Sequence, residues 1–216
     1  QRDLFHAFFL AFVFPQFPLT PYPIELLQFR TILLLKCFWN MDSVNAQQVS
    51  TFTLLRYRGF KNKYWALKMM RFAHPYLQDV EGMSFYKVLG SGRGIGFSMF
   101  PDWSAYGLMQ VWDKEEYAER FLDESPLIQL YRERSEGPVV FFLKNLSSHG
   151  QWSGREPFTS DSPVKDDPKP LAILTRASVK TSRLIRFWRF VPVAERPLRN
   201  AEGLLWSKGF GEVPLM

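Results

Sequence analysis

The chain has few of the residues that metal sites and disulfide frameworks require. Its 216 residues include one cysteine, Cys37, and three histidines, His6, His74 and His149. A single cysteine excludes an internal disulfide and a zinc site built on several thiolates. The histidines do not stand at the short spacing of a zinc or non-haem iron site. We therefore expect a reducing compartment and a cytoplasmic protein.

Short motifs of several enzyme classes are also missing. No Gly-x-Ser-x-Gly sequence occurs, so a hydrolytic triad has no support. The glycine-rich stretch 90–96 is followed by Pro101 instead of a helix start, and no Gly-Lys-Ser/Thr sequence accompanies it. A phosphate-binding loop is therefore disfavoured. Because side chains alone offer little catalytic chemistry, a difficult reaction would need a cofactor.

Long apolar runs are absent. Residues 1–40 contain two apolar runs separated by four prolines, and neither approaches the ~20 residues that span a bilayer. The pattern does not fit a signal peptide either. Residues 1–40 form an atypical N-terminal extension, and Met41 opens a polar stretch that leads into the first strand. Two explanations stay open: over-extended translation upstream of Met41, or an anchor that leans on a membrane.

Positive charge and aromatic residues are plentiful. The net charge is +6, but the basic residues are scattered, which favours solvated faces and predicts no nucleic-acid partner. A membrane surface or an acidic redox partner is the alternative reading of this charge. Aromatic residues make up 17% of the chain, with 21 Phe and 7 Trp. They predict either an aromatic core or a cavity for a large flat or polyene ligand.

The sequence repeats itself once. Residues 53–56 recur as residues 173–176, and the two arginines are 176 − 56 = 120 positions apart. The pattern Gly-x-x-(Phe/Trp)-x-Lys-x-x-Gly at 82–90 recurs at 203–211, an offset of 211 − 90 = 121. A repeat of this length indicates two related structural units.

Hydrophobic periodicity divides the first copy into alternating elements. It predicts strands at 50–58, 83–89, 103–112 and 139–146, and helices at 62–73, 114–122 and 127–135. This β-α-β-β-α-β order is typical of a ferredoxin-like α+β domain. Residues 50–146 are therefore the first domain, and the polar stretch 147–170 is a linker.

The second copy covers residues 171–216 and is incomplete. It has a strand at 171–177, a helix at 183–190 that we expect to end at Pro192, and a strand at 203–211. By comparison with the first copy it needs a further strand, helix and strand. We therefore expect its half-sheet to carry an unpaired edge, which would make the chain unstable or prone to aggregate.

Four basic residues recur at equivalent strand positions: Arg56 with Arg176, and Lys87 with Lys208. Strand alternation places them on otherwise apolar faces. They would either contact an anion such as a carboxylate or propionate, or extend to solvent at a sheet rim.

Two histidines are chemical candidates for a ligand. His74 lies at the end of the first helix, where a charged imidazole would also complement the helix dipole. His149 follows the fourth strand, where a loop histidine is commonly solvated.

Several separated strings match one family in order. Residues 85–92, 151–158, 174–177, 186–188 and 208–214 resemble the spheroidene monooxygenase family of carotenoid biosynthesis. The resemblance extends over about residues 51–216, and we regard it as specific to the family rather than to one substrate.

The resemblance implies a tandem dimeric α/β-barrel that acts as a haem-dependent monooxygenase. Such an enzyme inserts oxygen at C-2 of an acyclic carotenoid such as spheroidene and takes electrons from a ferredoxin-type donor. No ligand motif of the family matches a residue of this chain, so His74 and His149 are candidate iron ligands on chemical grounds alone, and another ligand could lie outside this sequence. Arg56, Lys87, Arg176 and Lys208 would suit contact with the haem propionates. The resemblance implies substrate contacts from Phe85, Trp103, Tyr106 and Trp152.

Other readings stay open beside the enzyme. The chain could be a ligand- or haem-binding α/β-barrel module without catalysis, since a fold does not fix a function. Association with a membrane surface and pairing of the first copy in a homodimer are further expectations.

Overall fold

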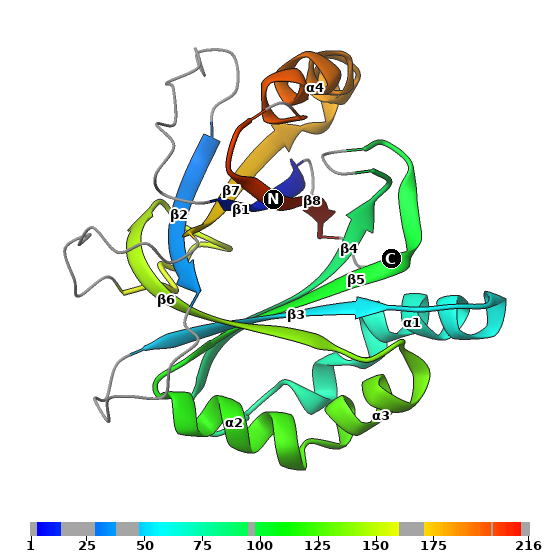
Figure 1. Ribbon diagram of the computed structural model, residues 1–216, viewed down its shortest axis with the longest axis vertical. Coiled ribbons are helices and arrows are strands. Elements are labelled where there is room, and N and C mark those ends of the chain that lie inside the picture. The colour runs from blue at the N-terminus through cyan, green and yellow to red at the C-terminus, as the bar shows by residue number, and fades with distance from the viewer. Residues whose placement is uncertain are drawn as a thin grey trace.

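Eight antiparallel strands close into a barrel in the order β1-β7-β2-β6-β3-β5-β4-β8 (Figure 1). The computed structural model describes residues 4–13, 29–37, 48–94, 98–159, 171–199 and 201–212. The strands are β1 (Leu4–Val13), β2 (Phe29–Cys37), β3 (Val49–Arg56), β4 (Met83–Gly92), β5 (Pro101–Trp112), β6 (Val139–His149), β7 (Leu171–Lys180) and β8 (Leu204–Gly211). The helices are α1 (Phe60–Phe72), α2 (Glu115–Glu124), α3 (Pro126–Arg134) and α4 (Leu184–Arg199), with short 3-10 turns η1 (His74–Tyr76) and η2 (Thr181–Arg183).

The first copy has the predicted ferredoxin-like order. Its strands lie side by side as β6-β3-β5-β4, each antiparallel to its neighbour. The three helices α1, α2 and α3 cover the outer face of this half of the barrel (Figure 1). The α+β fold with a tandem ferredoxin-like repeat is therefore confirmed.

From Leu171 onward the second copy contributes β7, α4 and β8, as the repeat predicts. One boundary is wrong: α4 continues past Pro192 to Arg199. A proline inside a helix costs about 3 kcal/mol because it lacks an N–H and its ring crowds the preceding turn. Phe187 and Val191 are buried against β7, and packing of this kind offsets such a cost.

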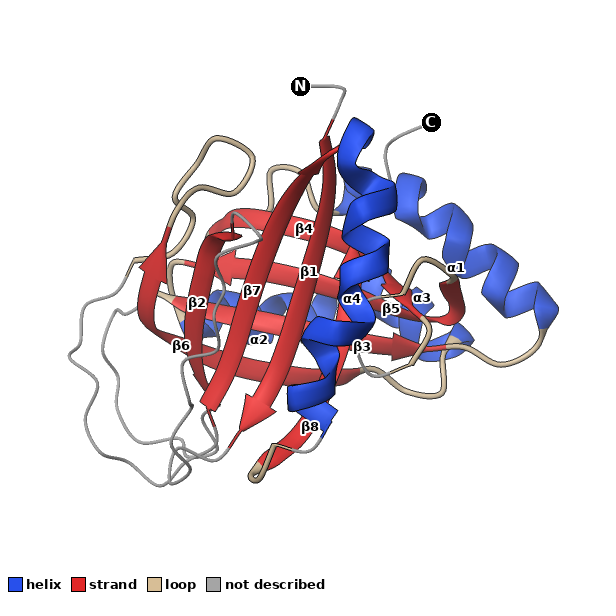
Figure 2. Cartoon of the chain, turned by 90° about the horizontal axis from the view of Figure 1, so that it is seen from above, coloured by secondary structure: helices blue, strands red, loops and turns tan. Residues whose placement is uncertain are grey.

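The expected unpaired edge of the second copy is absent in the described barrel. Strand β1 lies between β7 and β8, and β2 lies between β7 and β6 (Figure 2). The prediction of a bare edge was wrong because hydrophobic periodicity does not tell which distant strand pairs with an edge. The two readings of residues 1–40 and the domain limits stay predictions.

The sheet separates two apolar layers. Side chains on the inner face fill the barrel, and those on the outer face pack under the helices. On β4, for example, Phe85 and Leu89 face inward, whereas Tyr86 and Val88 face the helices. Lys87 falls on the inner side, as strand alternation predicts.

The two copies meet at an equivalent position of the repeat. Gly90 of β4 lies opposite Gly211 of β8, and these two glycines are equivalent in the repeat.

Among the described residues, none of the helices is both long enough and apolar enough to span a bilayer.

Candidate functional site

An aromatic cluster fills one part of the barrel interior. It consists of Phe85 from β4 and of Trp152 and Phe158 from the segment that follows β6. Phe85 contacts Trp152 edge to face with ring centroids 5.2 Å apart, and Phe158 lies 6.2 Å from Trp152. Trp152 is fully buried. We call these three rings the inner aromatic cluster.

Residues 151–158 form a folded segment that carries two of these rings inward. Trp152 and Arg155 exchange backbone hydrogen bonds of 2.7 and 3.2 Å across a tight turn. Gly154 has a φ of 77°, which glycine adopts without the steric cost of a side chain. The turn therefore fixes where the Trp152 side chain enters the barrel.

Polar side chains hold the end of this segment. The Gln48 amide donates to the Pro157 carbonyl at 3.2 Å, and its oxygen accepts from the Thr159 backbone N–H at 2.8 Å. Asn145, itself buried, donates to the same Gln48 oxygen and accepts from Ser50. Because buried polar groups are costly when unpaired, this chain of bonds specifies one position for the segment.

A carboxylate links the segment to both copies. Glu212, just after β8, accepts the Trp152 indole N–H at 2.7 Å through one oxygen. Its other oxygen lies 3.3 Å from Lys87 Nζ. Lys87 also donates to Ser153 Oγ at 2.7 Å. Lys87 is therefore neutralised beside the inner aromatic cluster and held by two partners.

Arg176 reaches the same segment from β7. Its guanidinium donates to the Gln151 carbonyl at 2.9 Å, and its side chain is almost fully buried. Lys87 and Arg176 thus converge on residues 151–153, from the first and the second copy respectively.

The other two recurring basic residues lie elsewhere. Lys208 pairs with Asp102 at 3.0 Å and donates to the Gly94 carbonyl at 3.1 Å. Arg56 is exposed and lies 3.8 Å from Glu136. The structure thus brings together only two of the four predicted anion-binding residues.

The two candidate iron ligands do not meet. His74 is half-buried on the helix-covered side of the sheet, with Nδ1 3.2 Å from the Tyr86 hydroxyl. His149 is exposed at the end of β6, with Nε2 3.3 Å from Ser147 Oγ. Throughout the described ranges, no group of three or more His, Cys, Asp or Glu residues is placed to hold a metal ion.

Of the four predicted substrate contacts, Phe85 and Trp152 touch inside the barrel and the other two lie apart. Trp103 is exposed near the start of β5. Tyr106 is buried on the outer face, where its ring contacts Tyr57 at 5.8 Å. Burial, with a smaller contribution from the negative charge of Asp102, raises the pKa of Tyr106 to about 12.

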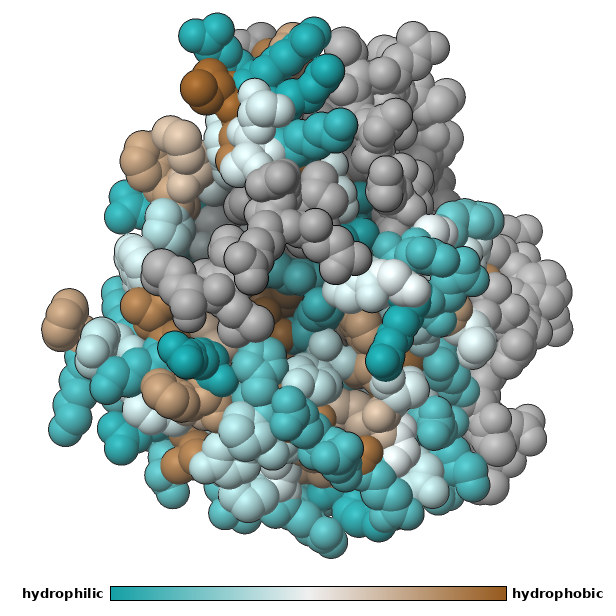
Figure 3. Space-filling view, turned by 180° about the vertical axis from the view of Figure 1, so that it is seen from behind, coloured by the Kyte–Doolittle hydropathy of each residue, from teal (hydrophilic) through white to brown (hydrophobic). Residues whose placement is uncertain are grey.

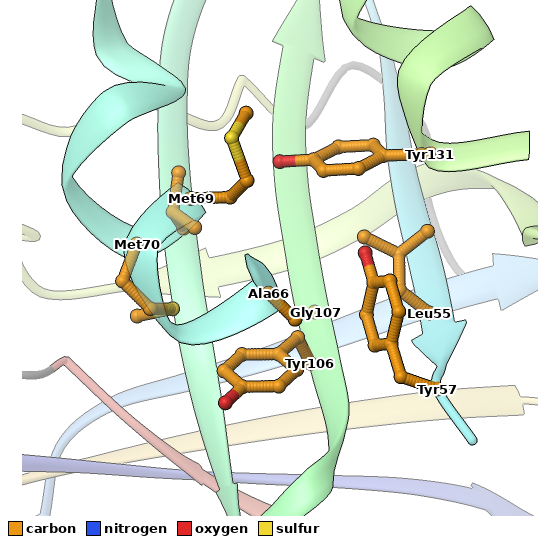
Figure 4. A pocket seen from close by; sticks show the side chains of 9 residues that line it. Leu55, Tyr57, Ala66, Met69, Met70, Tyr106, Gly107 and Tyr131 are labelled. Atoms are coloured by element: carbon orange, nitrogen blue, oxygen red, sulfur yellow. The ribbon is translucent and has the colours of Figure 1, made fainter. Parts of the chain in front are cut away.

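Tyr106 lines a small pocket between the sheet and α1 (Figure 4). The free volume of the pocket is about 10 Å³, roughly the space for one water molecule. Burial is the main cause that raises the pKa of Tyr57 and of Tyr131, which also line it. The phenols therefore stay neutral at physiological pH and make the pocket an uncharged, partly polar space.

The inner aromatic cluster is apolar and closely packed. Its three rings contact one another, and the polar groups beside it are already paired. From the back, most of the described surface is hydrophilic, and scattered hydrophobic residues show both at its edge and between hydrophilic ones (Figure 3). Sequence reasoning missed Glu212 as a partner of Trp152. The only available signal was its position, directly after the repeated glycine at 211.

The fold and its interior thus define a tandem ferredoxin-like barrel with an aromatic inner cluster. Three curated proteins, each named spheroidene monooxygenase, resemble the chain in sequence. The protein from Cereibacter sphaeroides is 32% identical over 169 residues, which is 78% of this chain and 52% of the relative. The protein from Rhodobacter capsulatus is 30% identical over 168 residues, covering 77% of this chain and 70% of the relative. The protein from Rubrivivax gelatinosus is 33% identical over 135 residues, 62% of this chain and 52% of the relative.

The chain belongs to the spheroidene monooxygenase family. It spans about half the length of the Cereibacter sphaeroides relative. No family model matches the chain.

Solved structures with a similar arrangement are distant. An anthrone oxidase-like protein covers 73% of this chain and 97% of its own, at 10% identity and a TM-score of 0.46. A dimeric protein of unknown function and ferredoxin-like fold from Bacteroides fragilis covers 44% of this chain and 93% of its own, at 13% identity and a TM-score of 0.33.

Proposed function

We propose that the protein acts as a carotenoid monooxygenase whose substrate is an acyclic carotenoid such as spheroidene, oxidised at C-2. Family membership supports the reaction class. The single observation that carries the proposal for this chain is the inner aromatic cluster, which lies inside a closed barrel. A polyene is long and apolar, and aromatic side chains bury it without unpaired polar groups.

Particular residues would have distinct roles. Phe85 and Phe158, whose rings pack edge to face within the cluster, would supply apolar contacts to the polyene. Trp152 would form a fixed wall, because Glu212 holds its indole N–H and the turn at 152–155 holds its backbone. Since Lys87 is paired with Glu212, the apolar chain would not meet an isolated charge.

Haem dependence is a separate proposal that rests on the family resemblance. The described residues do not by themselves form a haem site. His74 lies on the opposite face of the sheet from Lys87, and His149 is exposed. The two basic residues nearest the inner aromatic cluster are occupied by Glu212 and the Gln151 carbonyl. The visible spectrum of the whole protein with added haem tests this proposal, and the lack of a Soret band would contradict it.

Electron supply and membrane contact are further parts of the proposal. We propose a ferredoxin-type donor, and contact with a membrane surface through α4. The exposed side of α4 combines apolar and basic residues: Ile185, Phe190, Val193, Arg186 and Arg189. Such a mixture suits an anionic lipid surface, where an apolar carotenoid would be dissolved. Binding to vesicles with and without anionic lipid tests this contact. A homodimer stays a prediction.

Pigment analysis in a host that accumulates spheroidene tests the activity. We expect expression of the whole protein to convert spheroidene to a ketocarotenoid. Phe85→Ala should lower conversion at equal protein level, whereas Phe60→Ala should not, because Phe60 is 86% exposed on α1. Unchanged pigment with a folded whole protein would contradict the proposal. If purified protein bound the carotenoid without converting it, the non-catalytic binding module would be supported instead.

A further inference from the structure

The half of the barrel around the second copy contains four strands. Only two of them, β7 and β8, come from the chain after Leu171. In the first copy the order across the sheet is β6-β3-β5-β4, that is, its fourth, first, third and second strands. Around the second copy the order is β2-β7-β1-β8. Strand β7 is the first strand of the repeat and β8 the second. Strand β1 therefore stands in the place of a third strand, and β2 in the place of a fourth.

Strand directions agree with this assignment. In the first copy, β5 is antiparallel to both β3 and β4, and β6 is antiparallel to β3. In the second copy, β1 is antiparallel to both β7 and β8, and β2 is antiparallel to β7. Figure 2 shows β1 and β7 side by side along the barrel wall. All three relationships are thus the same in the two copies.

The pairing registers agree on which side chains face inward. Leu54 lies opposite Gly107 in the first copy, and the equivalent Leu174 lies opposite Leu10. Leu10 is buried within the barrel core, as its partner Leu174 is. In both copies, an inward-facing residue of the third strand therefore lies opposite the same repeat position of the first strand.

The copies differ by a two-residue shift at the second strand. In the first copy, Gly107 of the third strand lies opposite Leu89 of the second strand. The residue equivalent to Leu89 in the second copy is Phe210, but Leu10 lies opposite Lys208 instead. The pairing is therefore shifted by 210 − 208 = 2 residues. Because strand side chains alternate with a period of two, this shift leaves every residue on its own face.

The seams between the copies give independent support. Strand β8 pairs with β4, which joins the two second strands, and β2 pairs with β6, which joins the two positions for a fourth strand. A barrel made from two copies related by a twofold axis requires like strands to meet at each seam. Strand β2 meets this requirement only if it serves as the fourth strand.

We infer that β1 and β2 occupy the third and fourth strand positions of the second copy, the positions that β5 and β6 fill in the first copy. Residues 4–13 of the same chain fill the position between β7 and β8. This inference does not depend on the proposed oxygenase activity. It gives the N-terminal strands a structural function, because among the described strands β1 pairs with β7 and β8, and β2 pairs with β7.

Disulfide trapping tests the register of β1. In a Cys37→Ser background, Ala11→Cys with Ile173→Cys places two cysteines directly opposite each other. Opposite residues of antiparallel strands have Cα atoms about 4.5–5.5 Å apart, within the range for a disulfide. The matched control is Ala11→Cys with Thr175→Cys, two positions along the same face of β7 and about 8 Å away.

We expect mild oxidation to link the first pair within one chain about tenfold faster than the control pair. Equal rates, or no link in a folded variant, would overturn the inference. A link that forms only between two chains would also overturn it, because the strand would then come from a second copy.

Hydrogen exchange of the unaltered chain tests the same strand pairing without cysteine substitutions. It therefore gives a result even if the cysteine variants do not fold. We expect the backbone amides of residues 4–13 to be as protected as those of β7, since a central strand is hydrogen-bonded on both sides. Exchange at the rate of an unfolded peptide would overturn the inference. Neither result depends on pigment conversion, so failure of the proposed function is distinguished from failure of this inference.

Discussion

Glu212 accepts a 2.7 Å hydrogen bond from the indole N–H of Trp152, which joins the end of the second copy to the segment that follows the first. The same carboxylate pairs with Lys87 of β4. A fully buried tryptophan is thus positioned by a residue 60 positions away in the sequence. This relationship makes the inner aromatic cluster a property of both copies together.

Two substitutions of Glu212 distinguish its contact with Trp152 from its contact with Lys87. Glu212→Gln keeps a side-chain oxygen for the Trp152 N–H and loses the charge that faces Lys87. Glu212→Ala loses both contacts and leaves a buried donor unpaired, which costs about 1–3 kcal/mol. We expect the alanine variant to be clearly less stable than the glutamine variant in urea unfolding. Equal stability of the two variants would mean that the indole bond contributes nothing.

Trp152 and Trp103 provide a matched pair of tryptophans. Trp152→Ala removes a fully buried ring and should lower the free energy of unfolding by about 3–5 kcal/mol. Trp103 is 47% exposed, and Trp103→Ala should change stability much less. Chemical denaturation of both variants measures the difference. Similar losses in the two variants would argue against a buried Trp152.

Gly107 allows close approach of two aromatic rings inside the barrel. A Cβ at this position would lie 2.8 Å from Phe52 Cζ and 3.2 Å from Phe210 Cε1. We expect Gly107→Ala to cost about 1–3 kcal/mol, the usual range for overpacking. In a Phe52→Leu background the same substitution should cost less, because the closest contact, with Phe52 Cζ, is removed. A cost independent of Phe52 would contradict this explanation.

The pair between Asp102 and Lys208 predicts a dependence of stability on acid. Burial alone would raise the pKa of Asp102, but hydrogen bonds from Ser104 and Lys208 outweigh it and hold the pKa below its ordinary value of 3.8. A carboxyl with a lowered folded-state pKa stabilises the fold above its ordinary pKa. That stabilisation is lost as the pH falls through the folded-state pKa.

We therefore expect the stability of the unaltered chain to fall more steeply below about pH 4 than that of Asp102→Asn. In a Lys208→Met background, Asp102→Asn should change this slope less, because the ion pair is already broken. Unfolding curves measured at several pH values below 5 provide the test, and parallel slopes for all variants would contradict the prediction.

The raised pKa of Tyr106 predicts that stability is lost as the pH rises. Burial raises its pKa to about 12 from an ordinary value of 10.0. A phenol with a raised folded-state pKa contributes stability that is fully present below pH 10 and is lost as the pH rises toward 12. Tyr106→Phe should therefore weaken the alkaline loss of stability. Ultraviolet titration of phenolate together with circular dichroism measures both events, and ionisation of all tyrosines before unfolding would contradict the prediction.

Local sequence patterns were enough to predict most of the elements. Alternation at 50–58 and 83–89, together with helical spacing at 62–73, placed β3, β4 and α1 to within a few residues. The repeat placed β7, α4 and β8 as well. These features depend on residues that are neighbours in the chain, which is why periodicity finds them. The end of α4 was misplaced because tertiary packing outweighs the local effect of Pro192.

The sequence by itself determined the ferredoxin-like elements, their repetition, and the position of Lys87 and Arg176 on otherwise apolar strand faces. Only the tertiary structure decided that β1 and β2 pair with the second copy and that Glu212 meets Trp152. It also separated Tyr106 from Phe85, which lie on opposite faces of one sheet. The physical reason is that strand pairing and side-chain contacts across a barrel join residues far apart in the chain. Their partners are selected by closure of the whole sheet rather than by any local pattern.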